Sequence, residues 1–157
     1  MPRSNIFSAS ADELRDLFGD YLEGEGACIV LALSEHPLDD AARNAIAKSL
    51  DSFGYGDDAC MYATLLPADE SAEGGDVPLD PQALFLLLEG LDPLCVICAD
   101  AAATARLGEA CRTSYDLDAS IRVFGRPGVA FRDLAGLLAT EQGKQKAWHL
   151  LKSLPKR

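Results

Sequence analysis

The apolar residues of this chain gather in short, nearly continuous runs. Residues 27–33, 59–66 and 94–99 are apolar almost throughout, and such runs are typical of parallel strands that are buried on both faces of a sheet. Two shorter apolar runs, 121–124 and 128–131, flank a turn and predict short strands. The pattern therefore predicts a central, mostly parallel sheet of about four strands.

Segments with helical periodicity alternate with these strands. Asp80-Pro81 marks one helix start clearly, because an aspartate cap followed by proline favours the first turn of a helix. The predicted helices cover residues 11–23, 39–52, 80–91, 100–111, 133–139 and 141–154. Strands that alternate with helices predict a three-layer α/β/α sandwich.

The 157 residues fit a single domain. No internal repeat and no linker divides the chain. We therefore expect one α/β domain over residues 1–157, with an acidic N-terminal helix inside residues 1–26 and the core over residues 27–154.

Charge is unevenly distributed along the chain, whose net charge is −11. Residues 1–101 contain 20 acidic and 4 basic residues, whereas residues 102–157 contain 5 acidic and 10 basic ones. The whole protein should repel a polyanion at long range, while its basic C-terminal region remains able to contact phosphate. The other interpretation of these basic residues is a solvated helix surface.

The sequence predicts a cytoplasmic protein. No apolar run approaches the ~20 residues that are needed to span a bilayer, so no membrane partner is expected. The N-terminus lacks a basic region followed by an apolar core, so we expect no signal peptide.

The five cysteines and two histidines suggest neither a disulfide framework nor a metal site. An odd number of cysteines, several of them within predicted buried strands, indicates reduced thiols. Cys95 and Cys98 have redox-motif spacing, but on a strand they point to opposite faces, so we expect structural thiols. His36, His149 and the cysteines do not form a zinc-binding pattern. Neither a dinucleotide-binding nor a P-loop motif is present, and no cofactor is expected.

Ser34-Glu35-His36-Pro37-Leu38 is the most promising local motif. It follows a predicted buried strand and precedes a helix, so it lies at the carboxyl end of the sheet, where open α/β sheets bind ligands. Glu35 has the chemistry of a general base, and His36 has the chemistry of a general acid or base. An ordinary β–α connection remains the alternative interpretation.

Several sequence segments in the second half of the chain occur in a characteristic order. They are a hydrophobic strand after proline (91–99), an alanine-rich helix (101–108), a glycine-proline turn with a strand (125–131), paired leucines (137–138) and a helix with Lys and Trp (146–148). This order resembles the uracil-DNA glycosylase superfamily, especially its small bacterial branches. The resemblance extends over residues 27–154 and implies the fold of that superfamily.

When the family's motifs are matched to this sequence, several of their functional residues are missing. The family's first motif resembles Gly-Glu-Ala-Pro-Gly, and here Glu35 and Pro37 match while both glycines are replaced. A base-stacking Pro-Phe segment is missing, because a helix is predicted from Asp39. The base-reading asparagine falls near Ala63, and the histidine of the His-Pro-Ser loop falls near Asp133.

These replacements predict that base excision has been lost. The reaction requires a pocket for a flipped base and stabilisation of the negative charge that develops on the leaving base. An aspartate in place of the family's histidine would oppose that charge, and a protein of net charge −11 would bind duplex DNA poorly. The cysteine spacing also differs from that of the iron–sulfur branches, so no cluster is expected.

The resulting hypothesis is a glycosylase-like domain that binds a nucleotide, nucleic acid or small ligand at the carboxyl edge of the sheet. Glu35 and His36 are the candidate catalytic residues. The candidate ligand-binding residues are Pro37, Arg126, Arg132 and Asp133. This hypothesis predicts that the two arginines converge near the end of the first buried strand.

Two alternatives stay open. The chain is an interaction module that docks a protein partner, or a second copy of itself, through its acidic first helix or its basic last helix. Otherwise it is an enzyme of unrelated chemistry that uses Glu35 and His36. If the glycosylase-like domain is an enzyme, it is a glycosylase-type hydrolase. The loss of the family's motifs favours a protein that is not an enzyme.

Overall fold

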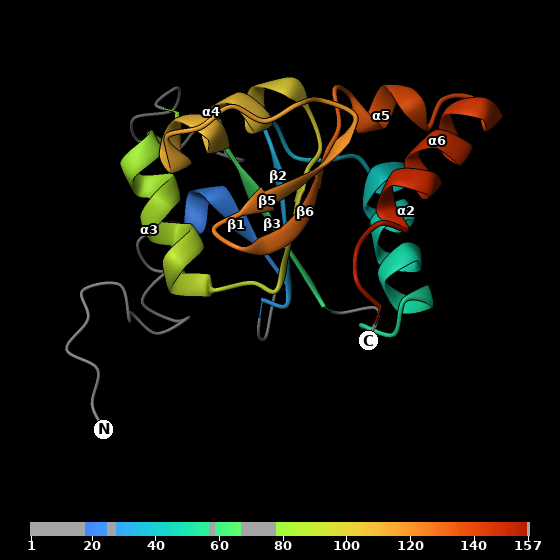
Figure 1. Cartoon of the computed structure of the whole chain (residues 1–157), viewed down its shortest axis with the longest axis horizontal. Coiled ribbons are helices and arrows are strands. Elements are labelled where there is room, and N and C mark those ends of the chain that lie inside the picture. Colours follow the sequence, from blue (N-terminus) through green and yellow to red (C-terminus); the bar gives the residue numbers. More distant parts are fainter. Residues whose placement is uncertain (1–17, 25–27, 57–58, 67–77, 157) are drawn as a thin grey trace.

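A computed structural model describes residues 18–24, 28–56, 59–66 and 78–156. These residues form a six-stranded sheet, a short 3-10 helix and five α-helices (Figure 1). The strands are β1 (Leu22–Glu23), β2 (Val30–Ser34), β3 (Cys60–Thr64), β4 (Cys95–Cys98), β5 (Ala119–Val123) and β6 (Arg126–Ala130). The helices are η1 (Gly19–Tyr21), α2 (Asp40–Ser52), α3 (Pro81–Leu91), α4 (Ala101–Cys111), α5 (Leu134–Leu137) and α6 (Glu141–Leu151).

The sheet has the strand order β1-β3-β2-β4-β6-β5. Its four central strands, β3, β2, β4 and β6, are parallel, and an antiparallel strand closes each edge. The predicted α/β class and the parallel centre are therefore confirmed. The sheet has six strands rather than about four: β5 and β6 correspond to the two short strands predicted around the turn, whereas β1 was not predicted.

Helices cover both faces of the sheet, as Figure 1 shows. Leu31 and Leu33 of β2 pack towards α3 and α4, whereas Val30 and Ala32 of the same strand pack towards α2 and α6. Successive side chains of a strand point to opposite faces. A strand that is covered on both sides must therefore be apolar at every position, which explains the continuous apolar runs.

Each of the five α-helices begins with a side-chain cap. Asp39, Asp80, Asp100, Asp133 and Thr140 accept a hydrogen bond from the backbone N–H three residues further on. Such caps satisfy N–H groups that have no partner within the helix. These starts agree with the sequence predictions to within about a residue.

The beginning of the described chain corrects a prediction. We expected a helix from Ala11 to Glu23, and residues 11–17 of it lie outside the described residues. At its end, Leu22 and Glu23 form β1 and pair with Ala63 and Tyr62 of β3. This pairing joins residues about 40 positions apart, so local helical periodicity could not reveal it.

The β5–β6 hairpin begins its second strand earlier than expected. Phe124 and Gly125 form the two-residue turn, both with positive φ (50° and 82°), as in a type I′ turn. Arg126 and Pro127 therefore belong to β6 rather than to the turn. Proline is tolerated here because pairing with β4 starts only at Gly128.

Among the helices of the described residues, none is long and apolar enough to cross a bilayer.

Candidate functional site

The connections of the sheet create a switch point between β2 and β4. After β2 the chain passes through α2 to β3 on one side of β2, and after β3 it passes through α3 to β4 on the other side. The two crossover helices lie on opposite faces of the sheet. Open α/β sheets bind ligands beside such a point, at the carboxyl ends of the strands.

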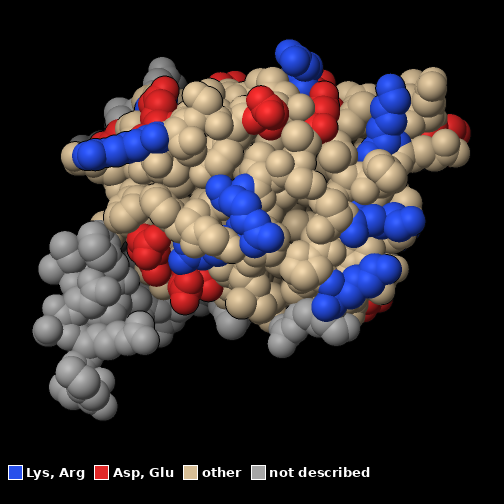
Figure 2. Space-filling model, viewed as in Figure 1, with Lys and Arg blue, Asp and Glu red and all other residues tan. Residues whose placement is uncertain are grey.

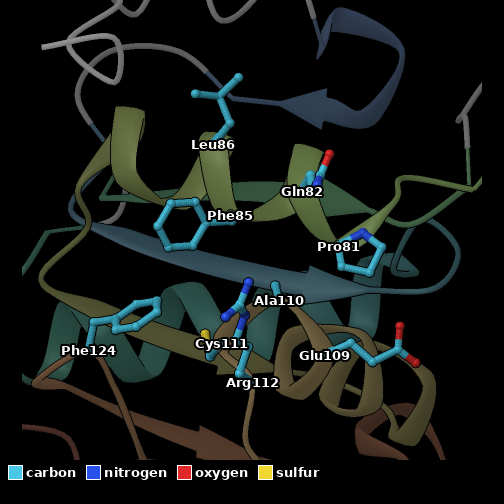
Figure 3. Close-up of a pocket in the computed structure, with 9 residues that line it drawn as sticks. All are labelled: Pro81, Gln82, Phe85, Leu86, Glu109, Ala110, Cys111, Arg112 and Phe124. Atoms are coloured by element: carbon cyan, nitrogen blue, oxygen red, sulfur yellow. The ribbon is translucent and has the colours of Figure 1, made fainter.

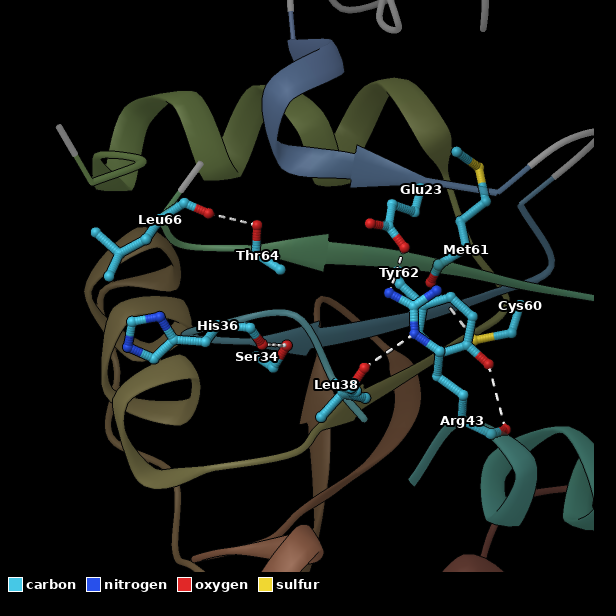
Figure 4. A network of polar contacts seen from close by, with 10 residues as sticks. All are labelled: Glu23, Ser34, His36, Leu38, Arg43, Cys60, Met61, Tyr62, Thr64 and Leu66. Atoms are coloured by element: carbon cyan, nitrogen blue, oxygen red, sulfur yellow. Dashed lines mark hydrogen bonds and ion pairs between the residues drawn. The ribbon is translucent and has the colours of Figure 1, made fainter. Parts of the chain in front are cut away.

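Buried hydroxyl groups shape the loops that leave β2 and β3. Ser34 Oγ donates to the carbonyl of His36 at 2.7 Å, and Thr64 Oγ1 donates to the carbonyl of Leu66 at 2.6 Å (Figure 4). Ser34 and Thr64 are paired in register on neighbouring strands. Each hydroxyl therefore makes the same local turn at the same edge of the sheet.

The loop after β2 is also held by Arg43 of α2. Its Nε donates to the carbonyl of Leu38 at 3.1 Å, and its guanidinium lies 4.7 Å from the centre of the Tyr62 ring and pairs with Glu23 (Figure 4). These contacts join α2, β1 and β3 to the end of the loop. The loop backbone is consequently fixed at its start and its end.

Asp100 connects the two strands of the switch point. Its Oδ1 accepts the N–H of Ala103 and caps α4 at 2.8 Å, while its Oδ2 accepts the N–H of Glu35 at 2.9 Å. The Leu66 N–H donates to the carbonyl of Glu35 at 3.1 Å. The backbone of Glu35 is thus bonded on both sides. The sequence predicted the cap, but the second bond spans 65 positions and carried no local signal.

The side chains of Glu35 and His36 project from this fixed backbone. Glu35 Oε1 lies 3.3 Å from His36 Nε2, with 45% of the Glu35 side chain and 67% of the His36 side chain exposed. Pro37 is exposed beside them. An ion pair at this exposure is weak. The pair offers solvated acid–base groups, and neither residue lines any of the cavities described below.

Arg126 lies at the opposite edge of the sheet, which corrects the expected convergence of the two arginines. It is the first residue of β6, and its Nε donates to the carbonyl of Pro93, just before β4. Its guanidinium pairs with Asp92 at 2.6 Å and Glu89 at 3.7 Å, and only 13% of the side chain is exposed. Because β6 is parallel to β4, its first residue cannot reach the carboxyl edge.

Arg132 and Asp133 do lie at the carboxyl edge, directly after β6. Asp133 bridges to Asp100 through its backbone, and the carbonyl of Arg132 accepts the N–H of Ala101 at 3.0 Å. The N–H of Arg132 donates to Asp118 Oδ1 at 3.1 Å. Backbone contacts therefore run from Glu35 through Asp100 to Asp133.

Asp118, Arg132 and Asp133 line a polar cavity of about 300 Å³, which we call the carboxyl-edge hollow. Its other walls come from α5 and from the start of α6. The lining residues are Asp118, Arg132, Asp133, Gly136, Leu137, Thr140, Gln142, Gly143 and Lys146. A second cavity of about 610 Å³ shares Asp118, Leu137, Gln142 and Lys146 with it and extends along α6 to His149.

The hollow contains two positive and two negative side chains. Neither Arg132 nor Lys146 forms an ion pair with another described residue. Asp118 accepts the N–H of Arg132, and Asp133 accepts the N–H of Gly136 at 3.1 Å, each through Oδ1. The second oxygen of each aspartate, Oδ2, accepts no hydrogen bond from another described residue. The sequence hypothesis contained Arg132 and Asp133 but missed Asp118 and Lys146.

The cysteines have structural positions. Cys95 packs towards α2 and α6 while Cys98 packs towards α3 and α4, so the predicted opposite orientation is confirmed. Burial raises the pKa of the Cys98 thiol from 9.0 to about 12 and also raises that of Cys95. Protonated thiols are poor nucleophiles and poor metal ligands. Within the described ranges, no group of three or more His, Cys, Asp or Glu side chains is arranged to hold a metal ion.

The positions that the resemblance to uracil-DNA glycosylases marks have local structural roles here. Ala63 is buried in β3 and packs in the core beneath α3 and α4. Asp133 caps α5. No protein-family model matches this chain, and no curated protein sequence matches it.

Proposed function

We propose that this chain is a ligand-binding domain that holds a mononucleotide in the carboxyl-edge hollow. The observation that carries the proposal is the pair of cations, Arg132 and Lys146, beside two carboxylates that each keep one oxygen uncommitted. A mononucleotide matches both groups, because its phosphate accepts hydrogen bonds from the cations and its ribose hydroxyls donate to carboxylates.

The position and size of the hollow support this ligand class. It lies at the carboxyl edge of the sheet, after the end of β6, which neighbours β4, one of the two strands of the switch point. Its 300 Å³ are at the lower end of the range for ligand sites, and the adjoining 610 Å³ give space for a base and sugar. A long nucleic acid is a poorer match because the chain carries a net charge of −11.

Local charge also favours an anion at this end of the molecule. Lys144 and Lys146 lie near the start of α6, beside the hollow, and both are exposed. Figure 2 shows basic side chains spread over the part of this face where α5 and α6 lie. They provide a positive local potential on a protein that is acidic overall.

We further propose that the chain is a divergent uracil-DNA glycosylase-like domain without excision activity. Two features support the loss of excision: Ala63 has no polar group with which to read a base, and the Asp133 carboxylate would oppose negative charge on a leaving base. A single-stranded oligonucleotide with one uracil tests this. We expect no release of uracil, and release that Glu35→Gln abolishes would overturn this part of the proposal.

The binding proposal is tested by calorimetric titration with uridine 5′-monophosphate. We expect saturable binding to one site, competition by inorganic phosphate and no heat from uracil alone. Arg132→Ala and Lys146→Ala should each weaken binding roughly tenfold or more, because each removes a hydrogen bond from a charged donor. Lys152→Ala is the matched control, since it removes the same charge from the C-cap of α6, outside the hollow.

Two results would contradict the binding proposal. One is the absence of saturable binding of uridine 5′-monophosphate at low ionic strength. The other is equal weakening by Lys152→Ala and Lys146→Ala, which would assign the binding to general charge rather than to the hollow.

A further inference from the structure

A further cavity lies away from the carboxyl-edge hollow, between α3, the end of α4 and the tip of the β5–β6 hairpin. Its volume is about 680 Å³, and we call it the hairpin cavity. It is lined by Pro81, Gln82, Phe85, Leu86, Glu109, Ala110, Cys111, Arg112 and Phe124 (Figure 3). It shares no residue with the carboxyl-edge hollow, and its lining is mainly apolar.

Two aromatic rings form one wall of the hairpin cavity. Phe85 of α3 and Phe124 of the hairpin turn meet edge to face, with ring centres 5.6 Å apart. Phe124 is 52% exposed, so much of its ring faces the solvent-open side. Exposed aromatic surface beside a cavity of this size is typical of sites for flat apolar molecules.

Arg112 provides the positive charge of the hairpin cavity. Figure 3 shows its guanidinium directed from the end of α4 towards Phe85, with Phe124 beside it. The Arg112 side chain has no ion pair with a residue in the described part of the chain. Glu109, the acidic residue of the lining, already pairs with Arg106 at 3.5 Å.

The backbone is strained at two of these residues. Arg112 has φ 54° at the C-cap of α4, and Phe124 has φ 50° in the hairpin turn. Glycine or asparagine suits both positions better, because a Cβ disfavours left-handed backbone. Large side chains are thus kept at two unfavourable positions that face one cavity, and strain of this kind concentrates at functional sites.

We propose that the hairpin cavity binds a small aromatic monoanion. Its ring system would lie against Phe85 and Phe124, and its anionic group would bind the Arg112 guanidinium. A guanidinium pairs well with a carboxylate or sulfonate, and apolar walls strengthen that pair by excluding water. This site is independent of the proposed nucleotide site.

Two naphthalene probes separate the charge from the ring system. 8-Anilinonaphthalene-1-sulfonate has both, and N-phenyl-1-naphthylamine lacks the sulfonate. We expect both to bind the folded full-length chain saturably at one site in a fluorescence titration. Non-saturable binding of the sulfonate probe, or fluorescence that rises only as the chain unfolds, would overturn the proposal.

Substitutions that relieve the strain distinguish binding from a structural role. Arg112→Gly should weaken the sulfonate probe at least tenfold and the neutral probe less than twofold. Phe124→Asn, which creates an Asn-Gly turn, should weaken both probes. Both variants should keep the Tm of the wild type or raise it by about 2–4 °C, since each removes a Cβ-related strain or provides a residue that suits the turn.

Lys48→Ala is the control for charge, because Lys48 lies on α2, on the other face of the sheet. The proposal would be overturned if Lys48→Ala lost as much affinity for the sulfonate probe as Arg112→Gly does. Unchanged affinity for this probe in Arg112→Gly would also overturn it.

Alkylation of cysteines in the wild-type chain provides a test that does not depend on how well a variant folds. Cys111 lines the hairpin cavity, whereas Cys28 does not. Saturating sulfonate probe should slow alkylation of Cys111 several-fold and leave Cys28 unchanged, as followed by peptide mass spectrometry. Equal rates at Cys111 with and without the probe would contradict the proposed position.

Discussion

The carboxyl-edge hollow and the hairpin cavity differ in how their walls are held. In the hollow, which is small and polar, Asp118, Asp133 and Thr140 each accept a hydrogen bond from the backbone N–H of another wall residue. At the hairpin cavity, Phe124 and Arg112 stand on left-handed backbone around a larger apolar space. The carboxyl-edge hollow suits a hydrogen-bonding ligand, and the hairpin cavity suits an aromatic one. One small domain therefore offers two chemically distinct surfaces.

The two regions have different structural origins. The carboxyl edge follows from topology, because every parallel strand delivers a loop to the same end of the sheet. The hairpin cavity follows from the distance at which α3, α4 and a hairpin tip happen to pack. Stability at the first region should therefore depend on backbone contacts, and the second should tolerate substitution of its lining.

Among the substitutions at the carboxyl edge, Gly143→Ala should lower the free energy of unfolding the most. An alanine Cβ would lie 2.7 Å from the carbonyl carbon of Leu137, so α6 could no longer pack against α5. We expect the free energy of unfolding to fall by about 3 kcal/mol in urea denaturation. Gly19→Ala is the control, because nothing lies within 4 Å of its Cβ, and it should change stability far less. Equal effects of the two substitutions would refute the close packing of α5 and α6.

Asp100→Ala should have the next largest effect, about 2 kcal/mol. The substitution removes the cap of α4 and also the bond to the Glu35 N–H. Asp80→Ala is the matched comparison, since Asp80 caps α3 through a single bond to Ala83, and we expect about 1 kcal/mol. Thermal unfolding of both variants measures the difference. An equal loss would indicate that the bond across the switch point contributes nothing.

Alkaline pH should lower the free energy of unfolding by a smaller amount. Burial raises the pKa of Cys98 from 9.0 to about 12, so the folded state keeps a proton that the unfolded chain releases above pH 9. Its contribution to stability is therefore complete below pH 9 and is lost as pH rises towards 12, by roughly 1 kcal/mol per pH unit. Cys98→Ala should show a shallower decline in urea denaturation between pH 9 and 10. An unchanged slope would contradict the burial of this thiol.

The smallest effect is expected for the exposed pair at the carboxyl edge. Glu35→Gln and His36→Ala should each change the free energy of unfolding by less than about 0.5 kcal/mol, because a solvated ion pair contributes little. Thermal unfolding at pH 7 provides the measurement. A loss of 2 kcal/mol would mean that these side chains, and not only their backbone, hold the loop.

Sequence patterns predicted the parts of this molecule that depend on neighbouring residues. Asp80-Pro81 and Thr140 marked helix starts correctly, and the continuous apolar run that contains Cys95 and Cys98 indicated a strand covered on both faces. These features follow from chain geometry within a few residues.

Contacts between distant residues could not be predicted in this way. The Asp100–Glu35 bond, the pairing of Leu22 with Ala63 and the place of Arg126 all depend on strand order. The candidate site was therefore only partly foreseen. Arg132 and Asp133 were recognised, while Asp118 and Lys146 reach the hollow through packing of β5 and α6, which no local pattern reveals.

A nuclear magnetic resonance titration of the isotope-labelled chain with uridine 5′-monophosphate tests the nucleotide site at the carboxyl edge most directly. We predict saturable shifts of the backbone amides of Arg132, Gly136 and Gly143, which surround the carboxyl-edge hollow, and unchanged amides of Arg112 and Phe124 at the hairpin cavity. Shifts confined to Arg112 and Phe124, or no saturable shifts, would contradict a nucleotide site at the carboxyl edge.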